Sequence, residues 1–235
     1  MISKIPRIIH QSWKDENIPF DVYKKSWIDS WQICHPGWEK MFWTDVQNAA
    51  LVKDCYPDFY DFYLSLSPNI KKADFCRFLY MHRYGGVYVD LDFICLKNLS
   101  PLLKEYELVL GSTSLDNDYY QIPNAFMASR PGLDFWLNAA RDAKNAPPEE
   151  QTVEKHAGPF RLQWAFYKYQ PEHSIVYGHE LIYPFDWIHF TGWNNGKYFK
   201  KDRVQLAQTL QNKCIEEIAA VFPKAYCLTF WTHNW

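Results

Sequence analysis

The most informative stretch of the sequence is RYGGVYVDLDF, residues 83–93, in which Asp90 and Asp92 end a short apolar segment. Side chains of a strand alternate between its two faces, so we expect both carboxylates on one side, about 6–7 Å apart. Two unpaired carboxylates there repel each other and resist desolvation. A divalent cation removes both problems, and hard oxygen ligands suit Mg²⁺ or Mn²⁺ bound together with substrate phosphates. The pair therefore predicts a metal site, although D-x-D also occurs in ordinary solvated loops.

The segment KKADFCRFLYMHRY, residues 71–84, predicts a buried helix, because apolar residues occur on most of its sides. Asp74 and Arg77 are three positions apart and hence neighbours on one helical face. One interpretation is a simple buried ion pair. The other is that Arg77 binds phosphate or ribose through its fork of donors while Asp74 accepts from ribose hydroxyls. The spacing alone is equally compatible with both.

The elements that must position these side chains are strands alternating with helices. We expect strands at 7–13, 38–45, 87–92, 107–112 and 124–129, and helices near 21–34, 46–66 (interrupted at Pro57), 68–84, 131–144 and 159–169. Ser67 is the expected N-cap of the helix 68–84, and Gly85 and Gly86 its end. This order predicts an α/β fold with one Rossmann-like, mixed but mainly parallel sheet flanked by helices. Ligands of such sheets bind beyond the carboxyl ends of the strands, where Asp90 and Asp92 are expected.

Composition excludes some classes of function. The formal net charge of the 235 residues is −2 and no long basic stretch occurs, which argues against nucleic acid as a partner. No run of about 18 apolar residues is present, so no transmembrane segment is expected. Residues 1–13 lack the apolar core of a signal peptide, and the six cysteines are scattered. Together these features predict a cytoplasmic protein with buried, reduced thiols.

Three motifs together resemble a known family. IPRIIHQSW (5–13), KKADFCRFLYMHRYGGVYVDLD (71–92) and the ending FWTHNW (230–235) resemble glycosyltransferase family 32, which includes yeast Golgi α-1,6-mannosyltransferases and bacterial capsule enzymes. The resemblance implies that residues 1–235 form a single GT-A domain. It also implies an enzyme that moves a hexose from a UDP- or GDP-sugar to a glycan or other hydroxyl acceptor. Mn²⁺ or Mg²⁺ and retention of the anomeric configuration are part of the same expectation.

The family's donor-binding positions fall on six residues of this chain, Trp13, Asp74, Arg77, Tyr88, Asp90 and Trp235. By resemblance, Trp13 stacks on or flanks the nucleobase. Asp74 and Arg77 hold ribose, sugar or phosphate, and Tyr88 lines the donor site.

The family's catalytic positions fall on the aspartate pair, and its metal ligands fall on the same pair and on His233 near the end of the chain. By resemblance, Asp90 contacts ribose or metal-bound water and Asp92 ligates the metal. His233 is a further metal ligand, and Trp235 donates to the diphosphate. The sequence departs from the family's common HHW at residues 229–231, which weakens the assignment of His233.

Several of these residues also have ordinary structural explanations. Trp13 can belong to the core of this aromatic-rich chain, and His10, inside an expected strand, is better explained as a hydrogen-bonded structural histidine. Asn124 and Gly158 either shape a sugar pocket or serve strand edges and turns. Aromatic side chains in loop-like segments are candidates to stack on an acceptor sugar, namely Tyr119, Tyr120, Trp187 and Trp193.

Two other classes of function are compatible with the same residues. One is a metal-dependent hydrolase of nucleotide sugars or phosphoesters that uses the aspartate pair. The other is a non-catalytic sugar-binding module. The presence of all four charged motif residues, Asp74, Arg77, Asp90 and Asp92, argues against it.

Overall fold

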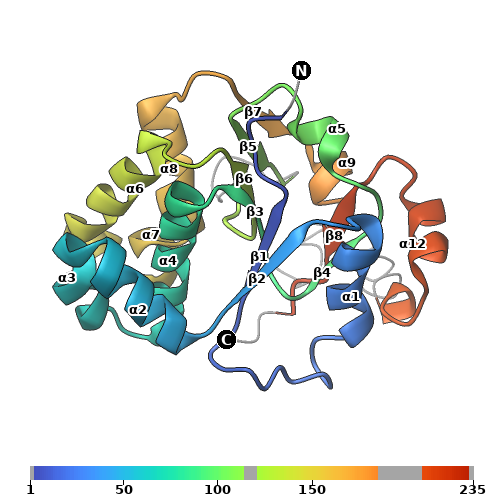
Figure 1. Ribbon diagram of the computed structural model, residues 1–235, viewed down its shortest axis with the longest axis horizontal. Coiled ribbons are helices and arrows are strands. Elements are labelled where there is room, and N and C mark those ends of the chain that lie inside the picture. The colour runs from blue at the N-terminus through green and yellow to red at the C-terminus, as the bar shows by residue number, and fades with distance from the viewer. Residues whose placement is uncertain (1–2, 114–120, 185–207, 233–235) are drawn as a thin grey trace.

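The computed structural model describes residues 3–113, 121–184 and 208–232 (Figure 1). Six strands form the main sheet in the order β2-β1-β3-β6-β5-β7. Their bounds are Ile8–Ser12 (β1), Glu39–Trp43 (β2), Gly86–Val89 (β3), Leu108–Gly111 (β5), Phe126–Ser129 (β6) and Ser174–Tyr177 (β7). β1 pairs in parallel with β2 and β3, and β5 with β7, whereas β6 runs antiparallel to both β3 and β5. The prediction of a mixed, mainly parallel sheet is therefore confirmed.

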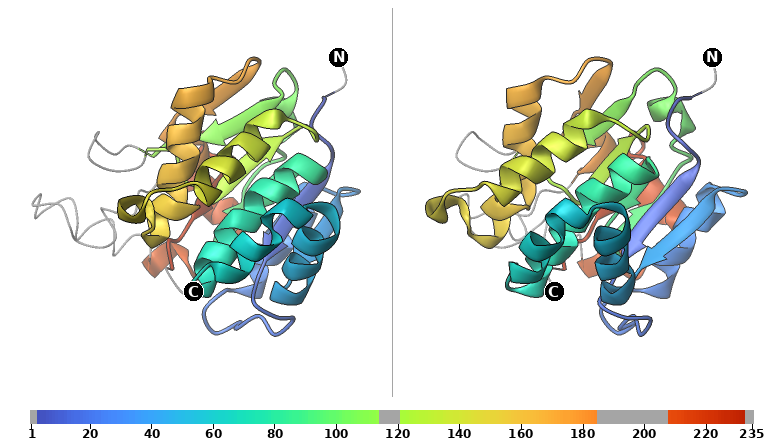
Figure 2. Two further views of the ribbon diagram at one scale, coloured as in Figure 1. Left: turned by 90° about the vertical axis from the view of Figure 1, so that its left-hand side faces the viewer. Right: turned by 60° about the vertical axis from the view of Figure 1, so that its left-hand side comes forward.

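Helices cover both faces of this sheet (Figure 1). One face carries α2 (Asp45–Cys55), α3 (Tyr60–Ser65), α4 (Asn69–Arg83), α6 (Asp134–Lys144), α7 (Val153–His156) and α8 (Pro159–Tyr169). Figure 2 shows α4 and α6 side by side in this layer, where they pack against each other. The other side carries α1 (Lys25–Cys34), α9 (His179–Ile182), α12 (Ile215–Val221) and a small antiparallel sheet of β4 (Phe93–Cys95) and β8 (Cys227–Thr229). Short helices at Pro57–Phe59 (η1), Ser100–Leu103 (α5) and Pro148–Glu150 (η2) complete the described elements.

The two-residue period of a strand divides the core into two halves. In β3, Tyr88 packs into the cluster formed with α4 and α6, whereas Val87 and Val89 pack into the cluster on the opposite face. In β6, Met127 packs into the first of these clusters and its neighbour Phe126 into the second. Because both faces of the central strands are buried, their register is fixed, and so is the position at which each strand ends.

His10 of β1 is a structural residue, as predicted. Its side chain has no exposed area. Trp43 Nε1 donates to His10 Nδ1 over 3.0 Å, so Nε2 carries the proton and donates to the Gly85 carbonyl over 2.8 Å. Burial lowers the pKa of His10 to about 4, which keeps the ring neutral at pH 7.

Three local expectations were wrong. The strand expected at 87–92 ends at Val89, because the chain turns there and the Phe93 N–H donates to the Asp90 carbonyl over 3.2 Å. The helix expected near 21–34 begins at Lys25, since the preceding residues form turns closed on Pro19. Helix α4 has Pro68, not Ser67, at its N-cap, and no side chain caps it.

The cysteines are only partly as expected. All six are described and free, but Cys55 and Cys214 are exposed, whereas Cys76, Cys95 and Cys227 are buried. In the described part of the chain, no helix has both the length and the apolar character needed to cross a bilayer.

The turn between α4 and β3 allows a test of backbone strain. Gly85 has φ +62°, and an added Cβ would lie 2.6 Å from the Ser129 carbonyl oxygen. Gly132 has φ +66° but nothing within 4 Å of such a Cβ. We expect Gly85→Ala to lower the free energy of unfolding by about 2–4 kcal/mol and the control Gly132→Ala by about 1 kcal/mol, because only the first adds a clash to the strain. Equal losses in urea unfolding would contradict the close approach at Gly85.

Candidate functional site

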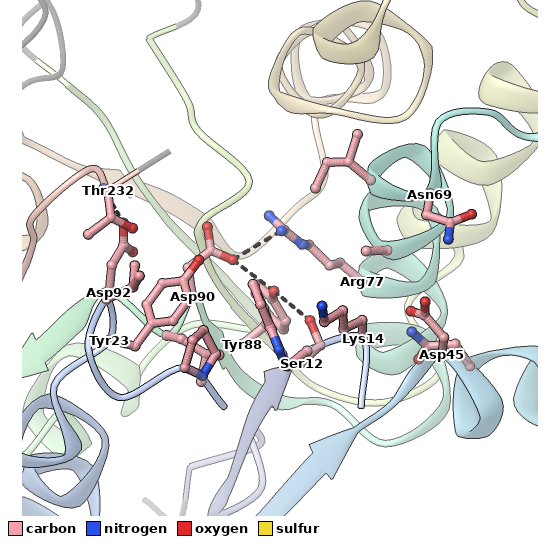
Figure 3. Close-up of a pocket in the computed structure, with 17 residues that line it drawn as sticks. Ser12, Lys14, Tyr23, Asp45, Asn69, Arg77, Tyr88, Asp90, Asp92 and Thr232 are labelled. Carbon is pink, nitrogen blue, oxygen red and sulfur yellow. Dashed lines mark hydrogen bonds and ion pairs between the residues drawn. The ribbon is translucent and has the colours of Figure 1, made fainter. Parts of the chain in front are cut away.

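A cavity of about 590 Å³ opens beyond the carboxyl ends of β2, β1 and β3. Each of these parallel strands is followed at once by residues that line it: Lys14 after β1, Asp45 after β2 and Asp90 after β3. Figure 3 shows Asp90 and Asp92 at one end of the cavity and Asp45 and Asn69 at the other. The position agrees with the rule that open α/β sheets bind ligands at this edge.

The aspartate pair lies in the turn between β3 and β4. Asp90 Oδ1 accepts from Tyr88 Oη over 2.8 Å and pairs with Arg77 Nη2 at 3.0 Å. Asp92 Oδ2 accepts from the Thr232 N–H over 2.9 Å, and the Asp92 carbonyl accepts from the Phe230 N–H. Both carboxylates line the cavity as predicted, but the turn, not the alternation of a strand, brings them there.

Arg77 joins the helix α4 to the aspartate pair. Its Nη1 lies 3.3 Å from Asp74 Oδ1 and donates to the Asn124 carbonyl over 3.1 Å. Asn124 Nδ2 in turn donates to Asp74 Oδ1 over 2.9 Å, and the guanidinium lies 4.7 Å from the centre of the Tyr88 ring. Arg77 is therefore both a buried ion-pair partner, as one interpretation of the D-x-x-R spacing held, and a wall of the cavity, whereas the binding of phosphate or ribose stays a prediction.

Burial dominates the electrostatics of the acidic groups. It raises the pKa of Asp74 and of Asp90 to about 6, with the Arg77 charge opposing the shift in each case. Burial also raises the pKa of Asp92, against the hydrogen bonds from Thr232 and Thr229. The cavity thus holds carboxylates that are costly to ionise without an added positive charge.

The donor set fits a hard divalent cation. No group of three or more His, Cys, Asp or Glu side chains placed to hold a metal occurs among the described residues. Within that same part of the chain, Asp90 and Asp92 supply the carboxylates at their end of the cavity, which matches cations bound by one or two carboxylates plus substrate phosphates. Two buried donor atoms of residues that line the cavity, Arg77 Nε and Trp13 Nε1, have no hydrogen-bond partner among the described residues. The charge of the Arg77 guanidinium, beside the aspartate pair, suits a phosphate-bearing ligand.

The structure brings most of the predicted donor-binding residues together. Trp13, Arg77 and Tyr88 line the cavity with the aspartate pair. The Trp13 ring is half-buried and packs edge-on against Tyr23. Asp74 is buried behind Arg77 and does not line the cavity. The remaining candidates lie outside the described residues: His233, Trp235, Tyr119, Tyr120, Trp187 and Trp193.

Sequence reasoning missed several residues of the cavity. Lys14 directly follows the strand expected at 7–13 and Asp45 is the last residue of the strand expected at 38–45, so the carboxyl-edge rule gave a signal that could have identified them. Tyr23 and Thr232 had no such signal, because Tyr23 comes from a turn and Thr232 is brought in by the pairing of β8 with β4.

Comparison with known proteins supports the interpretation of the motifs. Residues 21–109 match the family described as a glycosyltransferase sugar-binding region containing the DXD motif. The chain is 34% identical over 181 residues to inositol phosphoceramide mannosyltransferase 1 of Schizosaccharomyces pombe, covering 72% of this chain and 53% of the relative. It is 35% identical over 144 residues to mannosyl phosphorylinositol ceramide synthase CSH1 of Saccharomyces cerevisiae, covering 60% of this chain and 36% of the relative. The chain thus spans about half the length of these relatives or less. The predicted resemblance to the DxD glycosyltransferases is confirmed.

A solved structure supports the fold. The PaToxG glycosyltransferase aligns with a TM-score of 0.53 at 18% identity, covering 70% of this chain and 69% of that one. The sheet with its two helical layers is thus a GT-A fold, as the sequence predicted.

The prediction of a cytoplasmic protein is wrong. The relatives are named for adding mannose to inositol phosphoceramide, which is a membrane lipid. The prediction rested on the composition of residues 1–13, on the lack of a run of about 18 apolar residues and on the scattered cysteines, none of which outweighs the relatives.

The raised pKa of Asp90 gives a stability test. Folded Asp90 holds its proton up to about pH 6, so between that pH and the ordinary carboxyl pKa the folded state binds more protons than the unfolded one. The ionised carboxylate therefore costs stability at pH 7, and this cost declines as the pH falls from about 6 toward the ordinary carboxyl pKa. We expect Asp90→Asn to raise the free energy of unfolding by about 1–2 kcal/mol at pH 7 and by about half as much at pH 5, in urea titrations without metal. A variant less stable than wild type at pH 7 would mean that Arg77 outweighs the desolvation of Asp90.

Proposed function

We propose that this chain, whose residues 21–109 match a glycosyltransferase sugar-binding region containing the DXD motif, transfers a hexose from a nucleoside diphosphate sugar to a hydroxyl acceptor with the help of Mn²⁺ or Mg²⁺. The observation that carries the proposal is the convergence of Asp90, Asp92 and Arg77 at one end of a cavity beyond the carboxyl ends of three parallel strands.

The proposed mechanism places the diphosphate of the donor at this end of the cavity. A divalent cation held by Asp92 and Asp90 would offset the negative charge that builds on the leaving diphosphate. Arg77 would bring its positive charge to a phosphate at this end of the cavity, and Asp74 and Asn124 hold the guanidinium in place. Tyr88 fixes Asp90 by its hydrogen bond and supports Arg77 with its ring. These groups are preorganised donors and charges, which lower the barrier without reorganising during the reaction.

We further propose that the anomeric configuration is retained by front-face attack of the acceptor hydroxyl. A covalent route needs a carboxylate free to act as nucleophile at the sugar. The carboxylates that line the cavity in the described residues are Asp45, Asp90 and Asp92, of which two are assigned to the metal and Asp45 lies at the opposite end. Asp74 lies behind Arg77 and is not on the cavity wall.

The names of the relatives support mannose as the sugar and the headgroup of an inositol phosphoceramide as the acceptor. A hydrolase would use the same aspartate pair but would release sugar to water at a rate independent of acceptor. A non-catalytic module would bind the donor without consuming it. Incubation with radiolabelled GDP-mannose and Mn²⁺, with and without inositol phosphoceramide, separates the three functions. Labelled lipid that forms only when the acceptor is present supports transfer. Free mannose that is released at the same rate with and without acceptor, with no labelled lipid, contradicts transfer.

Loss of the metal ligand should abolish transfer without unfolding the chain. We expect Asp92→Asn to lower the transfer rate by about two orders of magnitude or more, the scale of removing a main electrostatic stabiliser. EDTA should have the same effect on the wild type, and Mn²⁺ should reverse it. The control Asp54→Asn replaces an exposed aspartate of α2 and should keep full activity. Full activity of the wild type in excess chelator would refute the metal.

Trp13 should contribute to donor affinity through its ring. We expect Trp13→Ala to weaken binding of the nucleoside diphosphate by about 1–3 kcal/mol, the range measured for bases stacked on aromatic side chains. Trp13→Phe keeps a ring and should lose much less. Calorimetric titration of the folded variants tests this, and an unchanged dissociation constant for Trp13→Ala would assign the side chain to the packing against Tyr23.

A further inference from the structure

Three of the six cysteines meet where α1 packs against the small sheet of β4 and β8 (Figure 1). Cys34 ends α1, Cys95 ends β4 and Cys227 begins β8. Cys34 Sγ lies 3.7 Å from the Cys95 carbonyl oxygen, although 61 positions separate the two residues in the chain, and the two thiols share a hydrogen bond. None of the three lines the cavity, so the proposed transfer of sugar gives them no role.

The backbone on both sides of the Cys34 and Cys95 thiols is fixed by contacts that involve neither sulfur. Ser30 Oγ of α1 accepts from the Cys95 N–H over 2.8 Å. Asn98 Nδ2, beyond β4, donates to the Cys34 carbonyl over 2.8 Å. Folding has therefore already closed the chain between the two thiols, and they face each other on a rigid support. Groups held in this way react with each other far faster than the same groups free in solution.

His35 lies next to Cys95 as a neutral ring. Its Nδ1–H donates to the Trp31 carbonyl over 3.0 Å and also faces Cys95 Sγ at 3.9 Å, while Nε2 accepts from the Leu99 N–H over 2.9 Å. Burial lowers the pKa of His35, which agrees with this neutral form. Because both ring nitrogens are engaged, His35 is a positioning residue for the Cys95 sulfur and is not free to act as a metal ligand.

Cys34 is the thiol of this group that a reagent can reach. Its side chain is half-buried, whereas Cys95 and Cys227 have no exposed area. The hydrogen bond with the Cys95 thiol lowers the pKa of Cys34, while burial and the charge of Glu216 oppose this shift. Burial raises the pKa of Cys95. A thiol that is partly exposed and more acidic than its buried neighbour is the expected point of attack in thiol–disulfide exchange.

Cys227 is the competing partner for Cys95, because the two are directly opposite in the antiparallel ladder. The Leu96 N–H donates to the Tyr226 carbonyl at the next position, so Cys95 and Cys227 form a non-hydrogen-bonded pair. The Cα atoms of such a pair are about 4.5 Å apart, at the short limit for disulfides. Neither thiol is accessible to an oxidant, so a bond between them requires Cys34 as an intermediate.

We propose that Cys34 and Cys95 form a site for thiol–disulfide exchange with a small disulfide such as oxidised glutathione, and that the product is a Cys34–Cys95 disulfide. The Cys34 thiolate attacks one sulfur of the reagent, whose S–S bond breaks and releases one glutathione. The Cys95 sulfur then attacks Cys34 and releases the second glutathione. Two protein thiols are oxidised, one glutathione disulfide is reduced, and the two thiol protons pass to the two released glutathione thiolates. The bond joins α1 to β4, the strand that begins directly after Asp92.

The test of the bond uses folded protein that carries Cys55→Ser and Cys214→Ser, which remove the two exposed cysteines that form mixed disulfides of their own. This parent protein is incubated with oxidised glutathione, alkylated and mapped by mass spectrometry. We expect peptides joined through Cys34 and Cys95, with no glutathione retained. Cys95→Ser in the same background should keep one glutathione on Cys34, because the second attacking thiol is missing. The matched control Cys227→Ser, which is also buried beside Cys95, should form the same bond as the parent.

The bond should also stabilise the fold, because it constrains a long loop of the unfolded chain, with 61 positions between its ends. We expect the oxidised parent protein to unfold at a urea concentration about 1 M higher than the reduced one, followed by tryptophan fluorescence. Dithiothreitol should remove this difference. Cys34→Ser, at the half-buried position, should show no difference between oxidising and reducing conditions.

Three results would overturn the proposal. One is a glutathione that stays on Cys34 of the folded parent protein, and another is a Cys95–Cys227 bond in place of the Cys34–Cys95 bond. The third is a Cys34–Cys95 bond that forms only in urea, since the folded geometry would then not supply it. Mapping of the parent protein needs no substitution of a buried cysteine, so it decides the proposal even if Cys95→Ser does not fold. No step measures sugar transfer, so the outcome is independent of the proposed function.

Discussion

The organisation of the cavity depends on one buried charge, the guanidinium of Arg77. It is held from α4 by Asp74, from the approach to β6 by the Asn124 carbonyl, and from the end of β3 by Asp90. A buried cation without partners would cost several kcal/mol, so these three segments are constrained to one arrangement. The same constraint aligns the helix that faces the cavity with the turn that carries the aspartate pair. The same contacts of Arg77 therefore determine both the stability of the fold and the geometry of the site.

The order of strands distributes chemistry along the cavity. Three parallel strands, β2, β1 and β3, end at the same edge, and the residue types after them differ. β3 is followed by the aspartate pair beside Arg77, whereas β2 is followed by the polar first turn of α2. Because the strands lie side by side at a fixed spacing, these groups sit at fixed distances across the sheet edge. A ligand with a charged end and a flat, hydrogen-bonding end suits such an edge better than a compact one does.

The sequence predicted the parts of the site that local patterns carry. The α4 pattern, the two glycines and the aspartate pair lie within residues 71–92. Their spacing, together with the resemblance to a known family, assigned Arg77, Tyr88, Asp90 and Asp92 to one site, and all four line the cavity. It could not predict that Asp74 lies behind Arg77, because that depends on Asn124 arriving 50 residues later in the chain. Nor could it predict Thr232 beside Asp92, which requires the pairing of β8 with β4 across more than 130 residues. The end of β3 was predicted wrongly for a related reason. Leu91 is apolar and so continues the apolar pattern of the strand past Val89, but the backbone has already turned there.

If the cavity takes a divalent cation and a diphosphate donor as proposed, its charges imply that the two bind cooperatively. Among the described residues that line it, three carboxylates (Asp45, Asp90 and Asp92) face two cations (Lys14 and Arg77), and Arg77 is already paired with Asp90. A diphosphate entering alone meets the uncompensated Asp92, and a cation entering alone finds two carboxylates whose pKa values burial has raised. Each ligand removes the repulsion that opposes the other, so each must raise the affinity of the other by the same factor. The desolvated aspartate pair, costly in the empty protein, is what makes that coupling strong, because charges in a cavity of low polarity interact more strongly than charges in water.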